Sequence, residues 1–152
     1  MNQAILGECT LDHVCIVTRD LGKTKRNYAA LVGAPIPEDI VNDDYENMHT
    51  WYRGAAAPRS GLSQCGFRDA NGVVVELIMP DDGPSAWNEQ LEERGDSLHH
   101  LAYRVKDLDA IVKRCEENGM PKIQSGDFTG GHYAYVDARA FVGCYLELME
   151  IF

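Results

Sequence analysis

The chain has 152 residues, of which 45% are hydrophobic and 25% are charged, a composition typical of a globular domain with a sizeable core. Its net charge of −10 argues against nucleic acid or an anionic membrane as the main partner. The same charge disfavours a highly anionic ligand, which would need a local basic patch. No stretch approaches the roughly 20 apolar residues of a membrane span, and the start lacks a basic region followed by an apolar run. We therefore expect a cytoplasmic protein.

The cysteines agree with that location. There are five of them, an odd number, and no Cys-x-x-Cys spacing occurs. This pattern favours reduced thiols over a disulfide framework, so we expect most of the cysteines to fill the core.

The first predicted element is an apolar strand at residues 11–17, which runs into Asp20, a residue suited to cap a helix. A helix over residues 20–32 follows, and a Gly-Ala-Pro segment ends it. The hydrophobic spacing predicts that one face of this helix carries Leu21, Tyr28, Leu31 and Val32.

The next segment has weaker patterns. We predict an acidic loop at 38–46, a strand at 47–53, a loop rich in Pro, Gly and Ala, and a second strand at 62–68. The Asn71-Gly72 pair is a strong hairpin signal, and it leads into a buried-looking strand with Glu76 at its centre.

A linker helix capped by Ser85 separates this half from a second one that repeats it. Residues 98–108 match residues 11–21, with Leu, His, Asp and Leu in register, and residues 143–149 match the Glu76 strand around Glu147. A helix from Leu108 and two strands, at 123–128 and 133–137, are predicted between the two matches.

Each half is thus a strand, a helix and three strands. The predicted fold class is α+β, with two tandem βαβββ modules in one domain over residues 1–152. Module one spans about 10–80, the linker helix about 85–95, and module two about 97–152.

The repeat places His13 and His100 at the same point of equivalent strands, and Glu76 and Glu147 at the same point of another equivalent pair. A carboxylate within such apolar sequence is unfavourable unless it is paired or bound to a metal. Two imidazoles and two carboxylates form a donor set suited to a divalent ion such as Zn, Ni, Co, Mn or Fe.

Any one of these side chains, taken alone, is more often a satisfied structural residue than a ligand. Their repetition favours the joint metal site. Because side chains alternate along a strand, His99 should face the helix layer rather than the site. His49 and His132 lack the support of the repeat, and either of them could line a pocket or lie in a loop.

Paired modules with His on each first strand and Glu on each last strand resemble the vicinal oxygen chelate superfamily, which includes glyoxalase I, methylmalonyl-CoA epimerase, extradiol dioxygenases and antibiotic-resistance proteins. The resemblance runs from about Thr10 to Phe152. It implies that each module curves into half of a barrel-like sheet around one metal ion. The implied metal ligands are His13, Glu76, His100 and Glu147.

Within the superfamily, four ligands fit the glyoxalase and epimerase branch, whereas dioxygenases keep a facial triad with open positions. The stretch from Glu76 through the linker helix to the double His is similar to methylmalonyl-CoA epimerases. Two features differ from them: residues 136–139 replace a His-Pro-Lys segment, and Gln64, which cannot take a proton, is the nearest polar residue to the epimerase base.

The leading hypothesis is a metal-dependent isomerase or lyase that acts through an enolate on a small carbonyl compound, closest to methylmalonyl-CoA epimerase. Glu147 is the favoured base, and Glu76 is nearly as eligible by symmetry. A glyoxalase I-like lactoylglutathione lyase is the enzymatic alternative. A protein of the same fold that binds a drug without turnover is the third reading, and the intact ligand set counts against it. Family members commonly dimerise, so we expect a homodimer.

Overall fold

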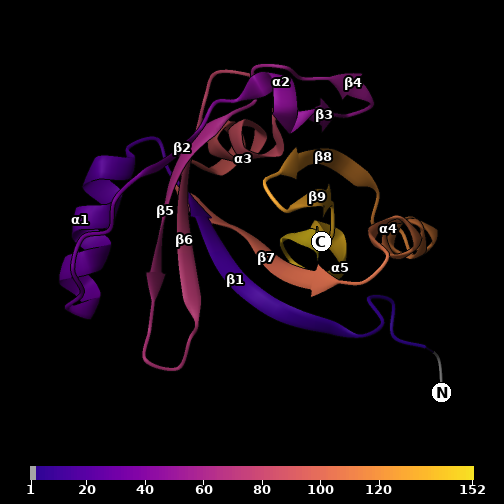
Figure 1. The fold of residues 1–152 in the computed structure, drawn as a ribbon, viewed down its shortest axis with the longest axis horizontal. Coiled ribbons are helices and arrows are strands. Elements are labelled where there is room, and N and C mark those ends of the chain that lie inside the picture. Colours follow the sequence, from indigo (N-terminus) through magenta and orange to yellow (C-terminus); the bar gives the residue numbers. More distant parts are fainter. Residues whose placement is uncertain (1–2) are drawn as a thin grey trace.

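The computed structural model describes residues 3–152. They form one ten-stranded sheet that curls strongly on itself, with the two longest helices on its outer side (Figure 1). The strand order is β2-β5-β6-β1-β7-β10-β9-β8-β3-β4. The predicted α+β class is confirmed, and the curled sheet agrees with the half-barrel that the resemblance implied.

The first half supplies one end of the sheet. Its strands are β1 (Cys9–Val17), β2 (Ile40–Asn42), β5 (Leu62–Arg68) and β6 (Val74–Pro80), and its helix α1 (Leu21–Val32) packs against β5 and β6. The Asp20 side chain caps α1 by accepting a hydrogen bond from the backbone of Lys23, as predicted. Gly33 ends the helix at φ +71°, a backbone conformation that favours glycine.

The second half repeats this arrangement. Its strands are β7 (Ser97–Val105), β8 (Lys122–Phe128), β9 (Gly131–Val136) and β10 (Tyr145–Ile151), and its helix is α4 (Leu108–Glu117). β1 and β7 pair antiparallel at the centre of the sheet and join the two halves. In each half the last strand lies parallel to the first: β6 to β1, and β10 to β7.

The helix α3 (Ala86–Arg94) connects the halves and begins at Ser85, whose hydroxyl accepts a hydrogen bond from the backbone of Asn88. This is the predicted linker helix. The short helix α5 (Arg139–Val142) precedes β10 and is not among the elements predicted from the sequence. None of the helices in residues 3–152 combines the length and the apolar character that a membrane span requires.

The segment between α1 and β5 differs most from the prediction. The expected strand at 47–53 is the short helix α2 (Tyr45–Met48) followed by β3 (Trp51–Tyr52), which pairs with β4 (Ala55–Ala56) and with β8. The acidic segment before it contains β2. One loop of the first half thus supplies strands at both ends of the sheet.

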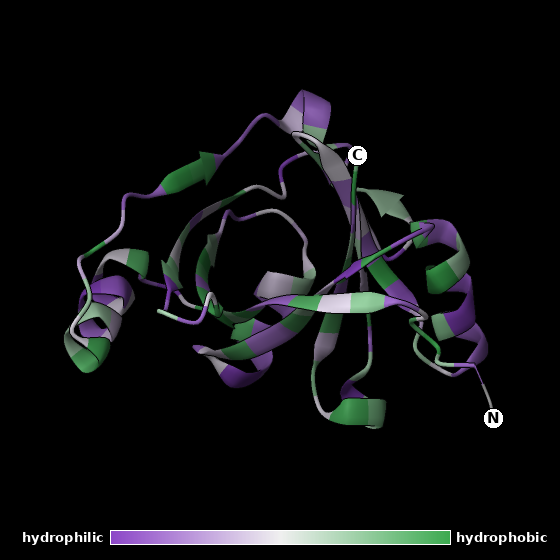
Figure 2. Ribbon diagram, turned by 60° about the horizontal axis from the view of Figure 1, so that its bottom comes forward, coloured by the Kyte–Doolittle hydropathy of each residue, from purple (hydrophilic) through white to green (hydrophobic). Residues whose placement is uncertain are grey.

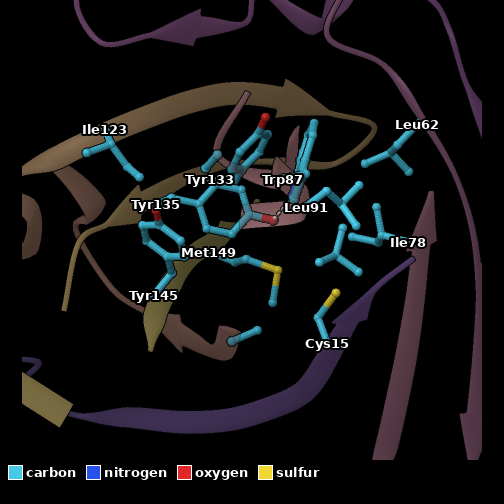
Figure 3. Close-up of a cluster of buried hydrophobic side chains, with 13 residues drawn as sticks. Cys15, Leu62, Ile78, Trp87, Leu91, Ile123, Tyr133, Tyr135, Tyr145 and Met149 are labelled. Carbon is cyan, nitrogen blue, oxygen red and sulfur yellow. Dashed lines mark hydrogen bonds between the residues drawn. The ribbon is translucent and has the colours of Figure 1, made fainter. Parts of the chain in front are cut away.

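Three clusters of buried side chains form the core. One lies beneath α1 and another beneath α4. The third lies inside the curve of the sheet, where Tyr133, Tyr135 and Met149 face Cys15 and Ile78 from the opposite side (Figure 3).

The predicted face of α1 is only partly buried. Leu21 is 2% exposed, whereas Leu31 is 79% exposed because the helix contacts β5 and β6 only over part of its length. Hydrophobic residues in the last turn of α1 and in β2 lie on the outside of the molecule, as Figure 2 shows.

Candidate metal centre

The four side chains predicted as ligands meet inside the curve of the sheet, where the two halves join. His13 lies on β1, Glu76 on β6, His100 on β7 and Glu147 on β10. In the strand pairing, Cys15 lies opposite both Glu76 and His100, and His13 points to the same face as Cys15 because it is two residues earlier. Each half therefore contributes one histidine and one glutamate.

The nitrogen Nε2 of His13 is the centre of the cluster. It lies 3.0 Å from Oε2 of Glu76, 3.2 Å from Oε2 of Glu147 and 3.2 Å from Nε2 of His100. Nε2 of His100 is also 3.1 Å from Oε2 of Glu147. The residues His13, His100 and Glu147 are buried, and Glu76 is partly so.

A single hydrogen cannot serve all three of these contacts, because Nε2 of an imidazole carries at most one. Three electron-rich atoms nevertheless approach Nε2 of His13. Two donors at right angles around an ion, each about 2.1 Å from it, lie about 3.0 Å apart, which matches the observed spacing. The donor set and its spacing therefore fit a divalent metal ion.

The other nitrogen of His13 has a fixed partner. Its Nδ1 lies 2.8 Å from Oδ2 of Asp12, and Nε of Arg104 donates to the second oxygen of that carboxylate at 2.5 Å. A carboxylate accepts from Nδ1–H, so a neutral His13, the form that binds a metal, presents the lone pair of Nε2 to the cluster. This is the carboxylate–histidine pairing that orients metal ligands.

His100 is oriented by its neighbour. Nε2 of the fully buried His99 donates to the carbonyl of Ala86 in α3 at 3.0 Å, which leaves Nδ1 of a neutral His99 as an acceptor. Nδ1 of His100 lies 2.8 Å away and donates to it, so the lone pair of His100 Nε2 also faces the cluster. His99 packs against the linker helix and supports the site from behind.

The carboxylates make the cluster strongly favourable for positive charge. Burial acts to lower the pKa of His13, but hydrogen bonds to Glu147 and Glu76 outweigh it and raise the pKa to about 11. Burial would raise the pKa of Glu147, yet the charge and hydrogen bond of His100, with those of His13, hold it below its usual value. His99 behaves oppositely, because burial and the neighbouring His100 lower its pKa to about 3.

Cys15 lies beside the cluster as a further sulfur donor. Its thiol, Glu76 and His100 each offer a ligand atom within 4.8 Å of the others. Burial, with the charges of Glu76 and Glu147, raises the pKa of the thiol well above its usual value, so the sulfur stays protonated unless a metal binds it. The sequence favoured a packing role for Cys15, and its complete burial in the inner core agrees with that role.

The cluster opens into a cavity of about 550 Å³, within the size range of small-molecule sites. Its floor includes His13, Glu76 and Glu147. The remaining lining is aromatic, aliphatic, acidic or amide-bearing, and consists of Val41, Asn42, Asp43, Asp44, Asn47, Met48, Leu62, Gln64, Ile78, Trp87, Asp127, Phe128, Thr129, Tyr133, Tyr135 and Met149.

The other residues considered from the sequence fall at different distances from this cavity. Gln64 lines it. His49 lies outside the lining but contacts the wall residue Asp127, with 2.7 Å between Nδ1 and Oδ2. His132 is also outside the lining and is bound to Glu150 at 2.9 Å.

Sequence reasoning missed Asp12 and His99, which support the proposed ligands. It also missed the solvent-facing carboxylates at the opening of the cavity, Asp43, Asp44 and Asp127, here called the mouth. Asp12 directly precedes His13, and an Asp-His pair is a signal that could have been used. Asp43 and Asp44 belong to the predicted acidic loop at 38–46, and nothing in the sequence shows that this loop lines the cavity.

Comparisons with known proteins agree with this architecture. The family model described as Glyoxalase/Bleomycin resistance protein/Dioxygenase superfamily matches residues 12–136. Among solved structures, methylmalonyl-CoA epimerase from Mycobacterium tuberculosis aligns with a TM-score of 0.61 at 25% identity, covering 93% of this chain and 87% of that one.

A Streptomyces coelicolor methylmalonyl-CoA epimerase variant in complex with 2-nitronate-propionyl-CoA aligns with a TM-score of 0.63 at 21% identity, covering 93% and 94% of the two chains. A mutant of 4-hydroxymandelate synthase from Streptomyces coelicolor aligns at 17% identity with a TM-score of 0.58, covering 95% of this chain and 49% of that one. These two likenesses concern the fold alone. No curated protein sequence matches the chain.

Proposed function

Because the chain belongs to the glyoxalase/bleomycin resistance protein/dioxygenase superfamily, we propose that it is a metal-dependent isomerase or lyase that acts through an enolate on a small carbonyl compound. The observation that carries the proposal is the convergence of three electron-rich atoms on Nε2 of His13, at spacings that suit a shared ion. Four protein donors leave two positions of an octahedron for substrate oxygens. The proposed ligands are His13, Glu76, His100 and Glu147.

His13, Glu76, His100 and Glu147 would hold a divalent ion, which would supply Lewis acidity to a carbonyl oxygen of the substrate. The residues of the chain do the remaining work. Asp12 and His99 hold the two imidazoles in the tautomer that presents Nε2. Trp87, Tyr133 and Tyr135, all buried, line the cavity beside the proposed ligands and give this part of it an aromatic wall.

Proton removal next to the carbonyl needs an acceptor within hydrogen-bond reach of the substrate. Gln64 lines the cavity but cannot accept a proton. We propose Glu147 as the base, with Glu76 as the symmetric alternative, since both carboxylates reach the floor of the cavity. An epimerase would return the proton to the opposite face of the same carbon, whereas a glyoxalase-like lyase would return it to the neighbouring carbon.

The metal requirement is tested by the metal content of purified variants. The unmodified protein should hold about one divalent ion per chain, and His100→Ala should lose most of it. His132→Ala is the matched control, because it removes a histidine that lies outside the cavity lining. Equal metal content in all three proteins would contradict the proposed site.

The base is tested by deuterium wash-in at the carbon next to the carbonyl of candidate 2-acyl thioesters and hemithioacetals. Glu147→Gln should lower exchange by about 10²–10⁴-fold, the usual contribution of a general base, with metal content measured in parallel. Full exchange by metal-loaded Glu147→Gln would rule out Glu147 as the base. If the unmodified, metal-loaded protein exchanges none of these compounds, the drug-binding alternative is favoured.

A further inference from the structure

The charge of the cavity lining discriminates between negatively charged carbonyl substrates and uncharged or positively charged ones. The lining contains five carboxylates, and among the described residues it contains no lysine or arginine. Two of the carboxylates, Glu76 and Glu147, belong to the proposed ligand set and would balance a divalent ion. The other three, Asp43, Asp44 and Asp127, have no such role and leave the wall negative.

These three carboxylates lie toward solvent, where an entering ligand meets them first. Asp43 and Asp44 are exposed, and the side chain of Asp127 is 47% exposed. The neutral amide of Asn47 donates to Asp44 at 2.8 Å and leaves its charge in place, while Asp127 lies 2.7 Å from Nδ1 of His49. A negatively charged ligand is repelled at this mouth, and a positively charged one is attracted.

Among the described residues, no lysine or arginine lines the cavity, and three basic side chains elsewhere are paired with carboxylates. Lys25 is paired with Asp39 at 2.6 Å, Arg53 with Glu89 at 2.6 Å, and Arg139 with Asp137 at 2.8 Å. Arg59 lies against the ring of Tyr45, outside the lining. The phosphates of an acyl-CoA would therefore meet a negative mouth without a basic counterpart.

The interior of the cavity favours a flat apolar group. Trp87, Tyr133 and Tyr135 contribute aromatic surface, and Met48 and Met149 add polarisable sulfur, which packs well against rings. Phe128, which is 38% exposed, adds a further ring nearer to solvent. The indole nitrogen of Trp87 donates to the hydroxyl of Tyr135 at 3.1 Å, which holds these two rings in place.

We infer that this site takes a small carbonyl compound that carries a flat apolar portion and no negative charge outside its metal-chelating oxygens. The inference rests on the proposed function and narrows its substrate class. It sets this chain apart from the epimerase that was crystallised with 2-nitronate-propionyl-CoA, despite the shared fold.

The test uses the Co²⁺-loaded full chain and three chelating probes of one shape: benzohydroxamate, its 4-carboxylate and its 4-trimethylammonium derivative. Binding is followed by the visible absorption of Co²⁺ and by tryptophan fluorescence. The carboxylate probe should bind at least about tenfold more weakly than benzohydroxamate at low salt, and the ammonium probe more tightly, with both differences shrinking as salt rises. Propionyl-CoA should not displace benzohydroxamate.

The double variant Asp43→Asn, Asp44→Asn should reduce the difference in affinity between the carboxylate probe and the ammonium probe. The matched control is Asp109→Asn, Glu117→Gln, which removes the same number of charges from the exposed surface of α4. It should leave the difference in affinity between the two charged probes unchanged.

Three results would overturn the inference while leaving the metal site intact. They are binding of the carboxylate probe as tight as that of benzohydroxamate or tighter, displacement of benzohydroxamate by propionyl-CoA, and an unchanged difference in affinity between the charged probes in the Asp43→Asn, Asp44→Asn variant. Failure of the protein to bind Co²⁺, or of all three probes to alter the spectrum of bound Co²⁺, would overturn the proposed function itself.

Discussion

Asp12 and His99 do not line the cavity, but they bind Nδ1 of His13 and of His100. They thereby set the tautomer in which each imidazole presents Nε2 to the cluster. The repeat in the sequence indicated the proposed ligands but not these supports. The two supports stand at equivalent positions of the repeat but differ in residue type: one is a carboxylate on β1 and the other an imidazole on β7. The two halves use different chemistry to reach the same orientation. A symmetric pattern therefore predicts the donors better than it predicts what holds them.

The support given by His99 can be measured. His99→Leu removes the acceptor for Nδ1 of His100, so metal affinity should fall by about 10–100-fold, the usual effect of losing such a partner. His99→Gln, whose amide oxygen can accept the same hydrogen bond, should recover part of this loss. Competition with a chelating dye gives the affinity, and thermal unfolding of both variants checks that they fold. Unchanged affinity in folded His99→Leu would show that His100 orients itself.

Asp137 supplies a pH-dependent contribution to stability. Hydrogen bonds from Arg139 hold the pKa of the Asp137 carboxyl below its usual value of 3.8, although partial burial opposes this. A lowered pKa in the folded state stabilises the fold above the unfolded-state value, and that stability is lost as pH falls through the folded-state pKa. In urea unfolding, the stability difference between the unmodified protein and Asp137→Asn should be present near pH 6 and shrink below about pH 4. A difference that stays constant down to pH 3 would contradict this origin.

At the scale of elements, the mouth of the cavity depends on a close approach at Gly61. A Cβ there would lie 2.4 Å from the carbonyl oxygen of Asn42 and 2.7 Å from the ring of Tyr45. These two residues flank Asp43 and Asp44, so the glycine lets the acidic segment pack against the start of β5.

Gly61→Ala should therefore destabilise the protein by about 1–3 kcal/mol, as overpacking usually does, and should displace the mouth. Gly66→Ala is the control, since its Cβ would meet only Cγ1 of Val74 at 3.6 Å, and its effect should stay within about 0.5 kcal/mol. Denaturant unfolding of the two variants measures both values. Similar stability of the two would show that the segment around Asn42 moves aside without penalty.

Helices and strands with strong local signals could be predicted from the sequence. The caps at Asp20 and Ser85, the Asn71-Gly72 hairpin and the strand at 62–68 are as expected. The segment from 47 to 53 could not be predicted, because β3 exists through its pairing with β8, more than 70 residues away. Leu31 and Val32 fit a helical pattern but are exposed, since periodicity does not reveal how much of a helix the sheet covers.

For the whole molecule, the repeat was sufficient to predict the α+β class and the paired modules, and the curled sheet confirms both. The antiparallel contact of β1 with β7, which brings the two halves of the ligand set together in one chain, follows from the three-dimensional closure of the sheet. The size and charge of the cavity could not be predicted, because its wall comes from segments scattered between residues 41 and 149.

Assembly of the whole molecule remains a prediction. The sheet has two edges, β2 and β4, and Ile40 and Val41 on β2 are more than half exposed, as is Leu31 on the neighbouring α1. Such apolar edges are commonly covered by a second chain, so we expect a homodimer. Light scattering at micromolar concentration should give twice 16.9 kDa. A mass near 16.9 kDa would contradict the dimer.

The position of β10 has a consequence for biosynthesis. This strand is the last in chain order, yet it lies between β7 and β9, and it carries Glu147. As the ribosome releases the chain from its N-terminus, β7 and β9 emerge first, but they become part of one sheet only when β10 pairs with both of them. A chain that stops short of residue 145 therefore lacks the strand that joins β7 to β9. Glu147, the last of the four proposed ligands in chain order, arrives with that same strand.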